Sequence, residues 1–116
     1  MKSSDDPIYI KSMTEYLELV EATNDKPMVI DFTASWCPPC KRIGPIFVAK
    51  MADYPELVMK KVDVDEQKDI VELTKIQAFP EFKVYKDGKV VDSLTGANEG
   101  GLETLLQKAK ALVQVN

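Results

Sequence analysis

Apolar and polar residues follow one another along this chain in blocks that predict alternating strands and helices. The block at residues 28–33 is mostly apolar and β-prone, and Asp31 is the one charge within it, which indicates a buried central strand. Stripes of apolar side chains three or four residues apart indicate helices. The expected helices span residues 13–22, the segment after Cys40 as far as Met51, residues 70–76, and residues 102–113. The other expected strands span residues 8–10, 57–62, 81–85 and 89–95.

The first helix has a clear start signal. Ser12 and Glu15 have the spacing of a capping box, in which each side chain binds a backbone N–H of the first turn. Met13, Leu17 and Val20 follow at helical spacing and would form one apolar stripe. The sequence therefore predicts that this stripe packs the helix against the sheet.

The order of the expected elements defines a fold class. Asp87-Gly88 is a two-residue hairpin signal, so the last two strands should pair antiparallel at a sheet edge. Lys89 and Asp92 would discourage that edge from pairing with another sheet. Strands and helices alternate before this hairpin, which predicts a three-layer α/β domain around a mixed sheet. We find no repeat or linker, and expect a polar tail, 1–7, and a single domain, 8–116.

Composition narrows the partners and the compartment. The chain has 116 residues, 45% of them apolar, which is enough for one core. A net charge of −4 without a basic cluster argues against nucleic acid or a membrane surface as the partner. Neither an apolar leader nor a run of 18 apolar residues is present. Two cysteines are too few for a secreted disulfide scaffold, and a C-x-x-C pair without such a leader predicts a cytoplasmic protein in a reducing compartment.

Both cysteines lie where the central strand is expected to become a helix. Cys37 would be at the helix N-terminus, where unpaired N–H groups and the helix dipole favour a thiolate and lower the thiol pKa from about 8.5 toward 7. Cys40 lies one turn inside and should be more covered. Because Pro38 and Pro39 have no N–H, the Cys40 N–H is the first backbone donor available to the Cys37 sulfur. The pair is therefore expected to carry redox chemistry.

This stretch resembles the active site of the thioredoxin family. The matching residues are Asp31-Phe32, the motif Trp36-Cys37-Pro38-Pro39-Cys40-Lys41, and Pro45, five residues after the second cysteine. Pro38 stands where most members have Gly, as in some h-type thioredoxins and in tryparedoxins. The resemblance covers the chain from Ile8 onward. It implies a thioredoxin fold, with a five-stranded sheet of order 1-3-2-4-5 and two helices on each face.

The resemblance also implies a thiol–disulfide oxidoreductase that reduces disulfides in partner proteins. Cys37 would attack the partner disulfide, and Cys40 would resolve the mixed disulfide. Asp31 takes the role of proton acceptor for Cys40, with Lys61 near it. Burial by itself should raise the pKa of Asp31 from about 3.9 toward 7, although a cap at the strand end is the alternative role. No cofactor is implied, since the electrons pass through the cysteines.

A second matching segment is Phe79-Pro80, which in the family faces the cysteines with a cis proline. The backbone of Phe79 would then pair with an extended partner segment. The residues expected to form a small apolar rim for docking are Trp36, Pro80, Gly96 and Ala97. Glu81 and Thr33 depart from common family residues. Glu81 could repel acidic partners or raise the Cys37 pKa, or it could simply point to solvent.

Several alternatives belong to other classes. A zinc site needs about four ligands, and the chain has no His and only these two Cys, so only an intermolecular site would work. A structural disulfide would constrain the unfolded chain little. A non-catalytic binding module, a tryparedoxin-like carrier reduced by a small dithiol, and a glutaredoxin are the remaining alternatives. The favoured function predicts a monomer, disulfide-containing client proteins, and an NADPH-dependent thioredoxin reductase as electron donor.

Overall fold

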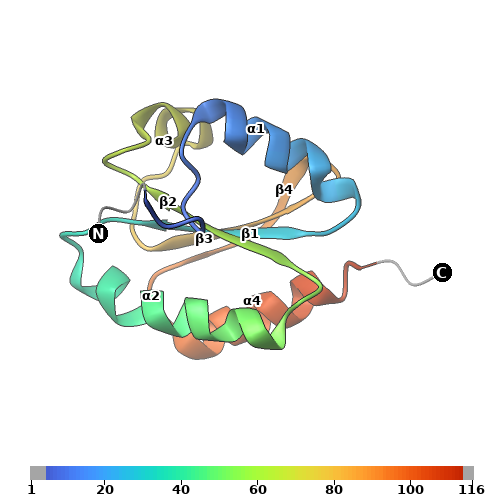
Figure 1. The fold of residues 1–116 in the computed structure, drawn as a ribbon. Helices are drawn as coiled ribbons and strands as arrows, with labels where there is room; N and C mark the ends of the chain where they lie inside the picture. Colours follow the sequence, from blue (N-terminus) through green and yellow to red (C-terminus); the bar gives the residue numbers. More distant parts are fainter. Residues whose placement is uncertain (1–4, 114–116) are drawn as a thin grey trace.

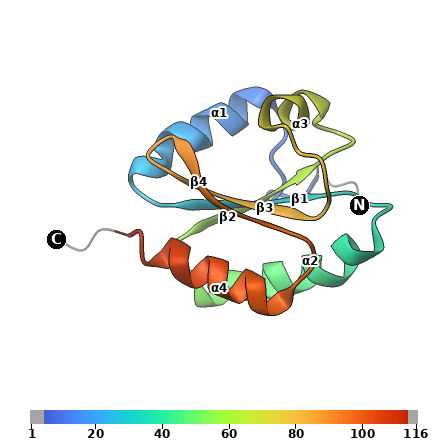
Figure 2. The same ribbon diagram turned by 180° about the vertical axis from the view of Figure 1, so that it is seen from behind.

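The computed structural model describes residues 5–113, which form three layers (Figure 1). A mixed sheet lies in the middle, with α1 (Met13–Glu21) and α3 (Lys68–Thr74) on one face and α2 (Pro38–Lys50) and α4 (Glu99–Lys110) on the other. Figure 2 shows the same arrangement from behind. The strands of this part of the chain are β1 (Met28–Thr33), β2 (Val58–Asp63), β3 (Glu81–Lys86) and β4 (Lys89–Thr95). The three-layer α/β prediction is confirmed.

The strand order among the described residues is β2-β1-β3-β4, with β1 and β2 parallel and the other pairs antiparallel. The five-stranded prediction is wrong in its count. The segment at residues 8–10 lies beside β2 as expected, but it forms an isolated bridge between Tyr9 and Lys61. Pro7 has no N–H to extend the ladder, and Ser12 already caps α1. The segment is therefore too short to form a strand.

β1 is the centre of the molecule, and all six of its residues are buried. Met28, Ile30 and Phe32 belong to the core cluster that also holds Tyr16 of α1 and Ile70 of α3. Val29 belongs to the other cluster, with residues of α2 and α4. Since side chains alternate along a strand, Asp31 is on the same face as Val29. The one acid of β1 thus faces α2, the helix that carries Cys40.

The capping prediction for α1 is confirmed, because the Glu15 N–H donates to Ser12 Oγ at 3.1 Å. The predicted stripe is wrong at Leu17, which is 51% exposed. Tyr16 is buried instead, and its hydroxyl is hydrogen-bonded to that of Tyr85 at 3.0 Å. A large side chain with a partner on β3 therefore takes the position facing the sheet.

The β3–β4 hairpin turns at Asp87 and Gly88, both with positive φ, as the sequence predicts. The turn is tied to the segment that precedes β1. The N–H of Asp87 donates to the Thr23 carbonyl at 3.3 Å, and the N–H of Gly88 donates to Thr23 Oγ1 at 2.9 Å. Lys86 is buried, and its ammonium donates to the Asn24 carbonyl at 2.8 Å. The hairpin thereby holds the start of β1.

All four sequence-based helix ends run past the ends in the structure, by one residue for α1 and α2, two for α3 and three for α4. α3 ends at Thr74 because Lys75 is left-handed, with φ 57°. α4 ends at Lys110 rather than at 113. Of the predicted tail, residues 1–4 lie outside the described residues, as do residues 114–116 of the predicted domain.

Candidate active site

The two cysteines form a disulfide at the point where β1 turns into α2, with Cα atoms 5.2 Å apart. Cys37 is the N-cap of α2, and Pro38 and Pro39 follow in its first turn. The Cys40 N–H donates to Cys37 Sγ at 3.4 Å. This is the donor that the two prolines leave available, so the expected contact is present. The sulfur of Cys37 therefore lies where the positive end of the helix stabilises negative charge.

The cysteines differ in what surrounds them more than in exposure, which is 5% for Cys37 and 2% for Cys40. Cys37 Sγ lies 3.8 Å from the carbonyl oxygen of Phe79. The peptide bond between Phe79 and Pro80 is cis, as the resemblance implies. Cys40 instead lines a cleft between α2 and β2. Cys37 therefore lies beside the Phe79–Pro80 loop, and Cys40 lies beside the cleft.

Residues from separate parts of the chain meet around Cys37 in an apolar rim, which consists of Trp36, Phe79, Pro80, Gly96 and Ala97. Trp36 is 60% exposed, and its ring packs edge-on against that of Phe79 with centroids 5.8 Å apart. The Gly96 N–H donates to the Pro80 carbonyl at 2.8 Å. The ring contact thus brings Trp36 to Phe79, and the hydrogen bond brings Gly96 to Pro80. Ala97 is placed by its neighbour Gly96.

Two residues that hold the rim were missed by sequence reasoning. Asp65, in the turn after β2, accepts a hydrogen bond from the Trp36 indole N–H at 2.8 Å. Arg42 of α2 donates to the carbonyl of Ala97 at 3.1 Å. These partners are 29 and 55 residues apart in the chain, and no local pattern indicates such pairs.

Asp31 is completely buried, and neither of its carboxylate oxygens has a hydrogen-bond partner among the described residues. Burial raises its pKa from 3.8 to about 7, while the positive charge of Lys61 acts in the opposite direction. The cap role at the strand end is not supported, because a cap would bind a backbone N–H. The carboxyl group can therefore exchange a proton near neutral pH.

Lys61 is directly opposite Asp31 in the register of β1 and β2. Its ammonium lies 5.7 Å from the centroid of the Tyr9 ring. A Cβ at Gly44 of α2 would lie only 3.1 Å from the same nitrogen. Lys61 therefore occupies space that Gly44 leaves free beside α2, as expected of a residue near Asp31.

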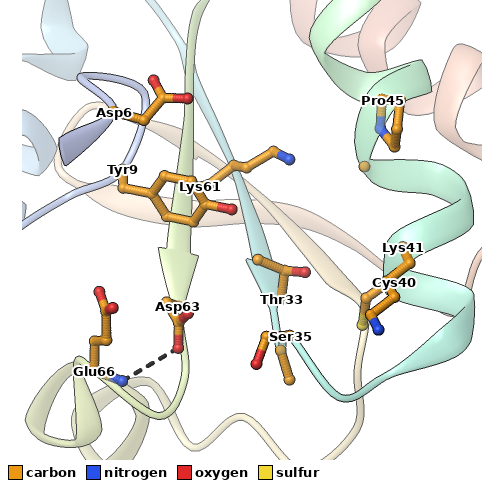
Figure 3. A pocket seen from close by; sticks show the side chains of 12 residues that line it. Asp6, Tyr9, Thr33, Ser35, Cys40, Lys41, Pro45, Lys61, Asp63 and Glu66 are labelled. Atoms are coloured by element: carbon orange, nitrogen blue, oxygen red, sulfur yellow. Dashed lines mark hydrogen bonds between the residues drawn. The ribbon is translucent and has the colours of Figure 1, made fainter. Parts of the chain in front are cut away.

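A cleft of about 590 Å³ lies beside the disulfide, between the start of α2 and the end of β2 (Figure 3). Cys40 and Lys41 line it from α2, and Lys61 and Asp63 line it from β2. Thr33 also lines it, from the end of β1. Solvent can reach the Cys40 side of the disulfide through this cleft.

Glu81 is paired with a neighbouring cation. It forms an ion pair with Lys83 at 3.1 Å, and the two side chains are only 14% and 16% exposed. Both residues alternate with Phe82 on β3, so they lie on the face of the sheet covered by α1 and α3. The alternative in which Glu81 points to solvent is therefore not supported, and its charge is balanced within the strand.

Within residues 5–113 there is no group of three or more His, Cys, Asp or Glu side chains placed to hold a metal ion. None of the helices described here has the length and apolar character needed to cross a membrane.

A disulfide at a strand-to-helix turn, opposite a cis-proline loop on this fold, defines a thiol–disulfide oxidoreductase. Comparison with known proteins agrees. The family model described as Thioredoxin matches residues 8–109, and the chain therefore belongs to the thioredoxin family. Its Cys37–Cys40 pair is the redox-active centre of this family, which acts on disulfide substrates.

Relatives of similar length support this assignment. A thioredoxin from Geodia cydonium is 45% identical over 103 residues, covering 88% of this chain and 97% of the relative. Human thioredoxin is 35% identical over 99 residues, covering 85% and 94%. The solved structure of Plasmodium falciparum thioredoxin has a TM-score of 0.82 at 39% identity, covering 86% of this chain and 96% of that chain.

Proposed function

We propose that this chain reduces disulfides in client proteins with Cys37 as nucleophile, Cys40 as resolving thiol and Asp31 as proton acceptor. The observation that carries the proposal is the different setting of the two sulfurs. Cys37 Sγ lies at the helix N-terminus beside the Phe79 carbonyl, whereas Cys40 lines the cleft between α2 and β2. A client sulfur approaching over the apolar rim would meet Cys37 first.

The cycle starts from the reduced pair. The Cys37 thiolate attacks a client disulfide, a Cys37–client disulfide forms, and the other client sulfur leaves as a thiolate. Asp31 takes the proton of Cys40. The Cys40 thiolate then attacks Cys37 Sγ, which releases the second client thiol and forms the Cys37–Cys40 disulfide seen here. Two electrons have then passed from the chain to the client.

The rim residues support client docking. Trp36 is exposed and Phe79, Gly96 and Ala97 are partly exposed next to Cys37, whereas Pro80 is buried, so an extended client segment can lie on the first four. Lys61 tunes Asp31 through its charge. A similar solved structure comes from a study of thiol resolution in yeast mitochondrial 1-Cys peroxiredoxin by glutathione and thioredoxin systems, at 32% identity and a TM-score of 0.82. An oxidised peroxiredoxin is therefore a client to test.

The regenerating donor in the proposal is an NADPH-dependent thioredoxin reductase, and the working compartment is the reducing cytoplasm. The test is insulin reduction by the purified chain, first with dithiothreitol and then with NADPH and a thioredoxin reductase, with Cys37→Ser as control. Activity with both donors, lost in the variant, is expected. Activity with dithiothreitol alone would replace the reductase with a small dithiol, as in a tryparedoxin-like carrier. Inactivity with both donors would contradict the proposal.

Asp31 has its own test. Asp31→Asn should slow resolution of the mixed disulfide more at pH 7 than at pH 9, because hydroxide can replace the carboxylate as proton acceptor at high pH. Single-turnover reduction of a client, followed across this pH range, measures the effect. Equal slowing at every pH would assign Asp31 a structural role.

A further inference from the structure

Arg42 is an exposed cation held against the apolar rim. It lies two residues after Cys40 on α2, and its guanidinium donates to the Ala97 carbonyl at 3.1 Å. The ion pairs found among residues 5–113 do not include it. A guanidinium has five N–H donors, so most of its donors remain available to a ligand.

A short series of contacts connects Arg42 with the reacting sulfur. Its acceptor, Ala97, follows Gly96, which is bonded to Pro80. Pro80 follows Phe79, whose carbonyl lies beside Cys37 Sγ. The guanidinium therefore lies at the border of the surface on which the client is proposed to dock.

The neighbouring cation lies elsewhere. Lys41 lines the cleft on the β2 side of α2 (Figure 3), whereas Arg42 reaches the loop before α4. On the other side of the rim, Trp36 is bound to the carboxylate of Asp65. The rim thus has a positive border at Ala97 and a negative one at Trp36, and opposite charges on a client would favour one orientation of it.

We propose that Arg42 determines client specificity by binding a carboxylate of Asp or Glu in the segment next to the client disulfide. The bond to Ala97 holds the planar guanidinium in place, which reduces the entropy lost when a carboxylate binds to its remaining donors. This inference rests on the proposed client reduction. It adds a preference for acidic segments that the apolar rim alone would not produce.

The test uses three disulfide-linked peptides that differ only beside the reacting cysteine. One has Gln on both sides, one has Glu on the N-terminal side, and one has Glu on the C-terminal side. The ratio of kcat/KM for a Glu peptide to that for the Gln peptide is the readout. We expect one Glu peptide to be preferred about two- to fivefold at low salt, the range of an exposed ion pair, and the preference to fall in 0.5 M NaCl.

Arg42→Gln should bring this ratio to about one, and Arg42→Lys should retain part of it. The ratio compares two peptides reduced by the same variant. A change in rim shape that lowers kcat/KM equally for all peptides therefore leaves the ratio unchanged. Lys89→Gln is the matched control, since it removes one positive charge at the exposed β3–β4 turn and should leave the ratio unchanged. A wild-type ratio of one, or a preference that persists in Arg42→Gln, would contradict the inference. Failure to reduce even the Gln peptide would instead contradict the proposed function.

Discussion

Asp31 and Lys61 lie directly opposite each other on the parallel strands β1 and β2, on the face that α2 covers. The carboxylate has no hydrogen-bond partner among the residues described, so the lysine charge opposes a large desolvation cost without removing it. This relationship makes the stability of the fold depend on pH.

Asp31→Asn should make the oxidised protein more stable at pH 8 than the wild type. The folded-state pKa, about 7, lies above the ordinary value of 3.8, so the folded protein binds the proton more tightly than the unfolded chain. The contribution of Asp31 to stability is therefore full below pH 3.8 and is lost as pH rises toward 7. The loss is on the order of 4 kcal/mol. Denaturant unfolding at pH 5 and pH 8 measures the part of this loss that falls between those two pH values, about 3 kcal/mol.

The control for that experiment is Asp25→Asn, at an exposed position before β1. The unfolding free energy of this variant should equal that of the wild type at both pH values. If the gain of Asp31→Asn were the same at pH 5 and pH 8, charge burial would not be its cause.

Lys61→Gln should move the pH dependence of client reduction upward. The lysine charge lowers the pKa of Asp31, so its removal leaves Asp31 protonated to a higher pH. The rate of resolution against pH is the measurement. Lys60→Gln is the matched control. Lys60 directly precedes Lys61 on β2, but its ammonium donates to the Pro7 carbonyl at the sheet edge. A profile unchanged in Lys61→Gln would separate Lys61 from the proton transfer.

Cys40→Ser should accumulate a mixed disulfide between Cys37 and its client, because the attack that releases the client is missing. Non-reducing gels with mass spectrometry identify the linked cysteine. Cys37→Ser should form no such complex and should not turn over. Normal turnover by Cys40→Ser would reverse the assigned roles.

Asp65→Ala should weaken client reduction by about two- to tenfold in kcat/KM, since it removes the hydrogen bond that orients Trp36. Asp65→Asn retains an acceptor oxygen and should lie closer to the wild type. Trp36 is the single tryptophan of the chain, so its fluorescence emission reports the change directly. An unaltered emission spectrum in Asp65→Ala would show that Trp36 holds its position without this bond.

Local patterns were enough for much of the fold. The Ser12 cap, the turn at Asp87-Gly88 and the position of Cys37 at the start of α2 all depend on residues close in the chain. These are the interactions for which spacing and residue type carry the physical reason. The family resemblance added the cis bond before Pro80, which local pattern alone would not predict.

Contacts between distant residues could not be predicted in the same way. Tyr16 replaces Leu17 at the sheet because it meets Tyr85, which is 69 residues away. Asp65 and Arg42 contact the rim only because the fold brings distant segments together. Nothing in their local sequence distinguishes them from other surface charges. The extended segment around Tyr9 failed as a strand because its neighbours limit its length.

The bonds between Thr23 and the β3–β4 turn have a consequence for engineering. The tip of this hairpin is exposed and lies at the opposite end of β1 from the disulfide, which would suggest a convenient place to display a foreign peptide. Its Asp87 and Gly88 amides, however, are committed to Thr23. An inserted peptide would separate those amides from their acceptors and loosen the start of the central strand. This turn is therefore a poor site for a grafted peptide, although it is exposed.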